Sequence, residues 1–160
     1  MKRFSYRKAI YLCGLIWFAV GLMLLYKGLH FVTDAAASFG RSPLLQSLRP
    51  MFGSYEQAAL ILICFGLFLG FIKRAVLAKT VKRTVGRITS YPEPIRFRQI
   101  YTKGYFILIA VMMSLGIIMR LVHLPLDIRG LIDVAVGSAL MNGALIYFRS
   151  AEKLRRAKTG

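Results

Sequence analysis

The sequence predicts an all-α integral membrane protein, with four transmembrane helices arranged as two antiparallel hairpins. Three observations predict this fold class. The 160 residues are 57% hydrophobic with a mean hydropathy of +0.58, whereas a soluble domain is about 45–50% apolar. The apolar residues lie in four long runs instead of short periodic stretches. Basic residues are concentrated in alternate segments between those runs.

We expect one membrane domain with spans at about 9–32, 57–72, 104–124 and 130–148. Each run is close to the roughly 20 predominantly apolar residues that a helix needs to cross a bilayer. The second run is the shortest, but no proline follows it before Pro92, so this helix is expected to extend into the cytosol. A cleaved signal peptide fits the first run poorly, because the run is too long and Lys27 and His30 interrupt it.

Both termini are expected in the cytoplasm, because Lys and Arg accumulate on the cytoplasmic side of membrane proteins. The N-terminal segment 1–8, the loop 73–103 and the tail 149–160 hold 18 of the 23 basic residues but only two of the six acidic ones. This distribution fits four spans in a bacterial inner membrane, with 33–56 as the outer loop. That loop contains a short amphipathic helix in our interpretation, with Ser42 as cap and Pro43 at the first position.

The formal charge of +17 is explained by the cytoplasmic segments, since each base near an anionic membrane surface adds about 1 kcal/mol of attraction. Six bases surround the extension of the second helix and lack the interleaved aromatic residues that stack on nucleic-acid bases. We therefore expect contact with anionic lipid and not with nucleic acid. The six residues are Lys73, Arg74, Lys79, Lys82, Arg83 and Arg87.

No catalytic or metal-binding pattern is found in the sequence, which lacks HExxH, GxSxG and Walker motifs. Cys13 and Cys64 each stand alone within an apolar run, without the partners that a zinc or redox site requires. The sequence thus predicts a non-enzymatic protein without a cofactor or metal.

Small residues at four-residue spacing predict where the helices pack, because small side chains let helix backbones approach each other in a membrane. We expect this packing within one chain first and between chains of a homo-oligomer second. The residues are Gly66 and Gly70 in the second span, with Ala135, Ala139 and Gly143 in the fourth. Ser138 and Asn142 are expected to form hydrogen bonds across the bundle.

An ion pair between Arg120 and Asp133 is predicted from depth. These residues lie nearly equidistant from the short turn that joins the third and fourth spans, so an antiparallel hairpin places them at similar heights. Charged side chains within a span are costly unless they are paired, hydrated or extended to the surface. An ion pair between Arg120 and Asp133 would lower this cost for both side chains.

An outer polar cluster is predicted because a base is followed three residues later by a histidine at two places, Lys27 with His30 and Arg120 with His123. Glu56 and Asp133 complete this predicted cluster of six residues. Such a cluster suits an anionic headgroup, a small anion or a proton relay. The alternative is that bases and histidines only mark the headgroup boundary. The spacings also leave open a duplication of one hairpin, with Gly70 aligned on Gly143.

Two functions follow from these residues. The first is a small non-enzymatic membrane protein that organises lipids or a membrane-protein partner, motivated by helix packing and the basic cytoplasmic rim. The second is an oligomeric carrier or channel that uses the outer cluster, motivated by the hairpin spacing.

Overall fold

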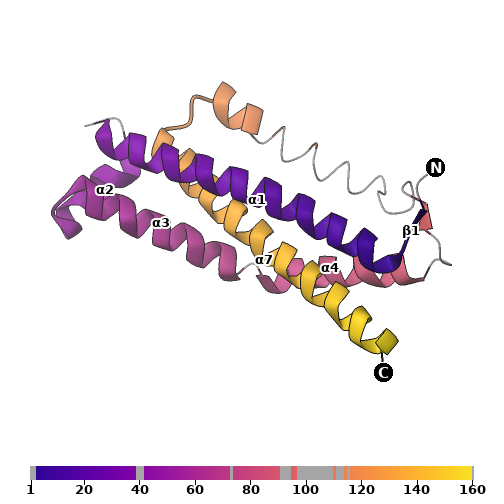
Figure 1. Cartoon of the computed structure of the whole chain (residues 1–160). Helices are drawn as coiled ribbons and strands as arrows, with labels where there is room; N and C mark the ends of the chain where they lie inside the picture. The colour runs from indigo at the N-terminus through magenta and orange to yellow at the C-terminus, as the bar shows by residue number, and fades with distance from the viewer. Residues whose placement is uncertain are drawn as a thin grey trace.

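Helices packed along one another make up most of the computed structural model (Figure 1), which describes residues 3–38, 42–72, 74–90, 95–96, 110, 114 and 116–159. The helices are α1 (Tyr6–Ala37), α2 (Pro43–Phe52), α3 (Tyr55–Ile72), α4 (Arg74–Thr89) and α7 (Leu126–Thr159), and residues 116–121 are also helical. Two short strands, β1 (Arg3–Phe4) and β2 (Ile95–Arg96), pair antiparallel.

Three helices of the described chain, α1, α3 and α7, are long and apolar enough to cross a membrane, and they indicate a membrane protein. They match three of the four expected spans. The other expected span, 104–124, lies largely outside the described residues. Large apolar side chains on these helices face outward, as in proteins surrounded by lipid; they include Leu15, Leu22, Tyr26, Phe65, Phe68 and Phe71.

Backbone contact between α1 and α7 forms the centre of the molecule. Small residues recur every seven positions along each helix, so they return to the same helix face after two turns. A Cβ atom added at Gly137 would lie 2.6 Å from the Leu25 nitrogen and 2.8 Å from the Gly21 carbonyl oxygen. Gly28 and Gly130 make the equivalent close contact. The two stripes are Gly14, Gly21, Gly28 and Ala35 in α1, and Gly130, Gly137, Ala144 and Ala151 in α7.

A second face of α7 receives α3 through the GxxxG pair identified in the sequence. A Cβ atom at Gly66 would lie 2.9 Å from Val134 Cγ1, and one at Gly70 would lie 2.7 Å from the Ala135 carbonyl oxygen and 3.0 Å from the Ala139 nitrogen. These small residues therefore pack within one chain. Gly143 belongs to a different contact, because it lies beneath the Trp17 ring of α1.

The helix α4 packs against the N-terminal part of α1 and the C-terminal part of α7. We had expected these residues only to extend the second span into the cytosol. Val81 and Ile88, seven residues apart on one face, are buried with Ile10 and Tyr147. Lys79, Lys82 and Arg83 stay exposed on the opposite side. The helix α4 is thus an amphipathic basic helix held against the bundle.

At the other end of the bundle, hereafter the α2 end, Asp127 joins α2 to α7. Its carboxylate is fully buried and accepts hydrogen bonds from the Leu44 and Leu45 N–H groups, at 2.7 and 3.4 Å, and from Ile128 N–H at 2.9 Å. The expected helix therefore forms, with Pro43 at its first position, but its cap differs from our expectation. Ser42 Oγ donates to the Ala35 carbonyl oxygen instead.

The polar pair in α7 also bonds differently from our expectation. Asn142 Nδ2 donates to the Ser138 carbonyl oxygen, and Ser138 Oγ donates to the Ala135 carbonyl oxygen. Both bonds stay within α7, because a helical side chain reaches the carbonyl group one turn earlier. Neither bond links two helices.

We predict that Gly137→Ala destabilises the protein by about 1–3 kcal/mol, because the added methyl group meets backbone atoms of α1 that cannot rotate away. Denaturation in mild detergent, followed by circular dichroism, measures this change. Gly86→Ala is the matched control, since a Cβ there meets nothing within 4 Å. That control should gain about 0.5–1 kcal/mol from helix propensity. Equal stabilities for the two variants would contradict the close contact.

Candidate functional site

A cavity of about 780 Å³ lies between α1, α7 and the helical segment 116–121. Its charged side chains are Lys27, Arg120, Arg129 and Asp133, and they lie toward the α2 end with Phe31 among them. Aliphatic side chains line the rest, including Val20, Leu24 and Val136. We call this space the charged cavity.

An ion pair inside the charged cavity joins Lys27 Nζ to an Asp133 carboxylate oxygen at 3.8 Å. The Asp133 side chain is 6% exposed and that of Lys27 is 44% exposed, so the acid is the desolvated member. A carboxylate removed from water needs a compensating charge. The contact between Gly28 and Gly130 supplies one by bringing the neighbouring Lys27 to α7.

The partner of Asp133 thus differs from the arginine that the sequence led us to expect. Arg120 borders the same cavity but is exposed and forms no ion pair with Asp133. Arg120 and Asp133 nevertheless border one cavity. The expected pairing overlooked α1, whose close approach to α7 places a lysine within 3.8 Å of the acid.

The aromatic ring of Phe31 lies close to two cations of the cavity. Lys27 Nζ is 5.3 Å from the ring centroid and Arg129 Cζ is 4.7 Å from it. A cation within about 6 Å of a ring is attracted to the negative face of its π system. Phe31 therefore helps to hold two positive charges at one end of an apolar cavity.

The two arginines of the cavity keep their donors unused. Arg129 Nε is buried without a hydrogen-bond partner. Within the described part of the chain, neither the Arg120 nor the Arg129 guanidinium forms a hydrogen bond or an ion pair. A buried donor without a partner costs free energy, so Arg129 Nε is a donor that a ligand or a water molecule can satisfy.

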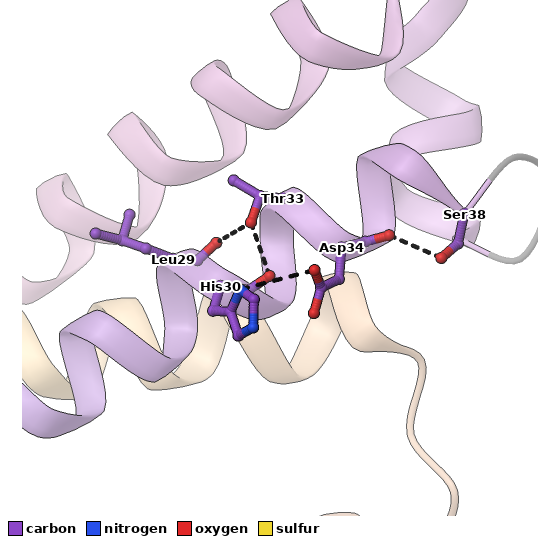
Figure 2. Close-up of polar contacts among 5 residues, drawn as sticks. All are labelled: Leu29, His30, Thr33, Asp34 and Ser38. Carbon is purple, nitrogen blue, oxygen red and sulfur yellow. Dashed lines mark hydrogen bonds and ion pairs between the residues drawn. The ribbon is translucent and has the colours of Figure 1, made fainter.

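His30 is exposed and is not among the side chains that line the charged cavity. Figure 2 shows it beside Asp34 on α1. Its Nδ1 is 3.7 Å from an Asp34 carboxylate oxygen, and both side chains are largely exposed. Local bonds complete this surface: Thr33 Oγ1 donates to the His30 carbonyl oxygen and Ser38 Oγ to that of Asp34. His30 therefore takes part in an exposed, local set of contacts within α1.

Glu56 and His123 are also separate from the charged cavity. Glu56 borders a second cavity of about 1170 Å³ at the α2 end, together with Arg49 and Tyr55. Arg49 Cζ lies 4.9 Å from the centroid of the Tyr55 ring. His123 is exposed in the turn before α7, with a φ of 50°. The structure thus brings together Lys27, Arg120 and Asp133, and leaves the other three members of the predicted cluster elsewhere.

Two residues of the cavity were missed by the sequence analysis, although their spacing was visible. Arg129 precedes Asp133 by four residues, and Phe31 follows Lys27 by four. Residues four apart share a helix face, so a search along the faces of the charged residues would have found both.

The basic face of α4 is a second candidate for binding anions. Its exposed bases are Lys79, Lys82 and Arg83, while Arg87 is partly buried and its Nε has no hydrogen-bond partner. The side chains of Lys73 and Arg74 lie outside the described residues.

No group of three metal-ligating side chains occurs among the residues that the structure describes. The sequence and structure match no protein-family model, no curated protein and no solved structure. The candidate site is therefore defined by its geometry and charge alone.

We predict an energetic coupling of about 1 kcal/mol between Lys27 and Asp133 in a double-mutant cycle of Lys27→Met and Asp133→Asn. Lys27→Met should be destabilising, because it leaves a buried carboxylate without its nearest cation. Thermal denaturation in detergent measures all four proteins of the cycle. The control cycle uses His30→Gln and Asp34→Asn, an exposed pair at a similar distance, which should show no measurable coupling. Equal coupling in both cycles would show that burial adds nothing to the Lys27–Asp133 pair.

Proposed function

We propose that this chain is a non-enzymatic membrane protein that binds an anionic lipid in the charged cavity. The observation that carries this proposal is the polarity of the cavity along the helix axes. Lys27 and Arg129 lie toward the α2 end, whereas Val20 and Val136 each lie seven residues further along the bundle. At about 1.5 Å per residue, the apolar end is about 10 Å from the positive end. A lipid is divided in the same way, into a charged headgroup and apolar acyl chains.

The charge of the cavity favours an anionic headgroup. Three cations, Lys27, Arg120 and Arg129, share the cavity with one carboxylate, that of Asp133. The side chains named as its lining therefore carry a net charge of +2 when all four are ionised. Arginine is well suited to phosphate, because its planar group donates two parallel hydrogen bonds to two oxygens.

The position of the cavity along α1 suits a headgroup as well. Residues 9–26 contain no charged side chain and extend about 27 Å as a helix, close to the roughly 30 Å hydrocarbon core of a bilayer. Lys27 follows immediately. The positive end of the cavity then lies where lipid phosphates lie, and the aliphatic end lies among the acyl chains.

Our proposal places the chain in a bacterial inner membrane with both termini in the cytoplasm and with 104–124 as a fourth span. The distribution of Lys and Arg supports this orientation. The charged cavity then serves the outer leaflet, and the exposed Lys79, Lys82 and Arg83 of α4 contact anionic lipid of the cytoplasmic leaflet.

The lipid proposal predicts that purified protein retains anionic phospholipid and that loss of the two cavity arginines removes it. We expect native mass spectrometry in mild detergent to detect bound phosphatidylglycerol in preference to phosphatidylcholine. Arg120→Gln with Arg129→Gln should weaken this binding by about tenfold or more, given the strength of hydrogen bonds to charged groups.

Arg49→Gln is the matched control, because Arg49 lies at the same end of the bundle but contacts Tyr55 outside the charged cavity. Binding that survives the double substitution, or that Arg49→Gln weakens as strongly, would refute the proposal.

The proposed orientation predicts the labelling of introduced cysteines in intact cells. With Cys13 and Cys64 replaced by serine, a cysteine at Arg49 should react with a membrane-impermeant maleimide applied outside. A cysteine at Lys153 should react only after lysis. Both positions are exposed in the structure. The reverse pattern would place the charged cavity in the cytoplasmic leaflet.

A further inference from the structure

The number of free charges and donors in the charged cavity restricts which anionic headgroup fits it. This argument rests on the proposed function and sharpens it. Asp133 is matched by Lys27, at 3.8 Å. Arg120 and Arg129 add two further cations, and neither guanidinium forms a hydrogen bond or a salt bridge within the described part of the chain. The ligand therefore meets a net charge of +2 from the four ionised side chains.

We propose that the cavity selects a lipid phosphate monoester, such as phosphatidic acid, over the phosphodiester headgroups of ordinary phospholipids. A phosphate monoester carries about −1.5 to −2 charge near pH 7, and a phosphodiester carries one negative charge. The monoester thus balances the net charge of the cavity, whereas a diester leaves one positive charge unbalanced.

The donors support the same selection. Each guanidinium can donate two parallel N–H groups to a pair of phosphate oxygens. A monoester has three unesterified oxygens, so two arginines can each be bidentate by sharing one oxygen. A diester has only two unesterified oxygens, so it cannot offer a pair of oxygens to each arginine by sharing a single one.

The aliphatic part of the cavity makes a lipid the source of this phosphate. Val20, Leu24 and Val136 continue away from the charges, and burial of a methylene group contributes about 0.8 kcal/mol. A soluble phosphate ester leaves this part of the cavity without a partner and therefore binds more weakly than a lipid that bears the same headgroup.

The test compares dioleoyl phosphatidic acid with dioleoyl phosphatidylglycerol, titrated onto the full chain in mild detergent and followed by native mass spectrometry. We expect phosphatidic acid to bind about tenfold more tightly, because one more charged hydrogen-bonding contact is satisfied. Arg129→Lys keeps the charge but loses the planar fork, so it should reduce the preference while both lipids still bind. Arg49→Gln should leave the preference unchanged.

Each other result overturns the inference in a distinct way. Equal binding of both lipids, lost together in Arg120→Gln, refutes selection of a monoester and leaves the proposed anionic-lipid function standing. Displacement of phosphatidic acid by an equal concentration of glycerol phosphate makes the ligand a soluble ester. A preference that persists in Arg120→Gln and Arg129→Lys places the selecting site elsewhere. Failure of both lipids to bind above phosphatidylcholine refutes the proposed function too. Circular dichroism and monodispersity confirm that each variant is folded.

Discussion

The direct contact between the backbones of α1 and α7 determines most of the remaining structure. At Gly21 with Gly137, and at Gly28 with Gly130, no side chain separates the two helices. Such contact is effective in a bilayer, where apolar side chains gain little from leaving lipid and close van der Waals packing drives association. It brings Lys27 to the buried Asp133, and it leaves a second face of α7 free for α3. The charged cavity lies beside this contact, and three of its four charged side chains, Lys27, Arg129 and Asp133, come from α1 and α7.

The approximate ends of three helices could be predicted from the sequence, because crossing a bilayer is a property of one segment at a time. The expected span at 57–72 corresponds to α3 at Tyr55–Ile72, and the extensions of α1 and α7 beyond the expected spans add less apolar turns. The packing of α4 on the bundle was not predicted. Its apolar face was visible, but a basic helix near a membrane surface has lipid as an equally suitable partner.

The sequence could suggest which charged residues lie at one level along the helix axes, but not which sides of the helices face the charged cavity. Depth follows from counting residues to a turn, which placed Arg120 and Asp133 at one level. The side of each helix that lines the cavity depends on which helices pack together. A sequence predicts this packing only where a known residue spacing marks a contact face. The seven-residue stripes of small residues are such a rule, because they mark the faces through which α1 and α7 meet. His30 and His123 each follow a cavity residue, Lys27 or Arg120, by three positions, yet both histidines are exposed. The repeated spacing alone therefore did not define a site.

The buried carboxylate of Asp127 has a consequence for the order in which the protein is built. It accepts the N–H groups of Leu44 and Leu45, 83 and 82 residues earlier in the chain. The ribosome therefore synthesises α2 well before Asp127. The Leu44 and Leu45 N–H groups cannot gain this acceptor until the start of α7 has been made, so the contact that joins α2 to α7 forms late in the synthesis of the chain.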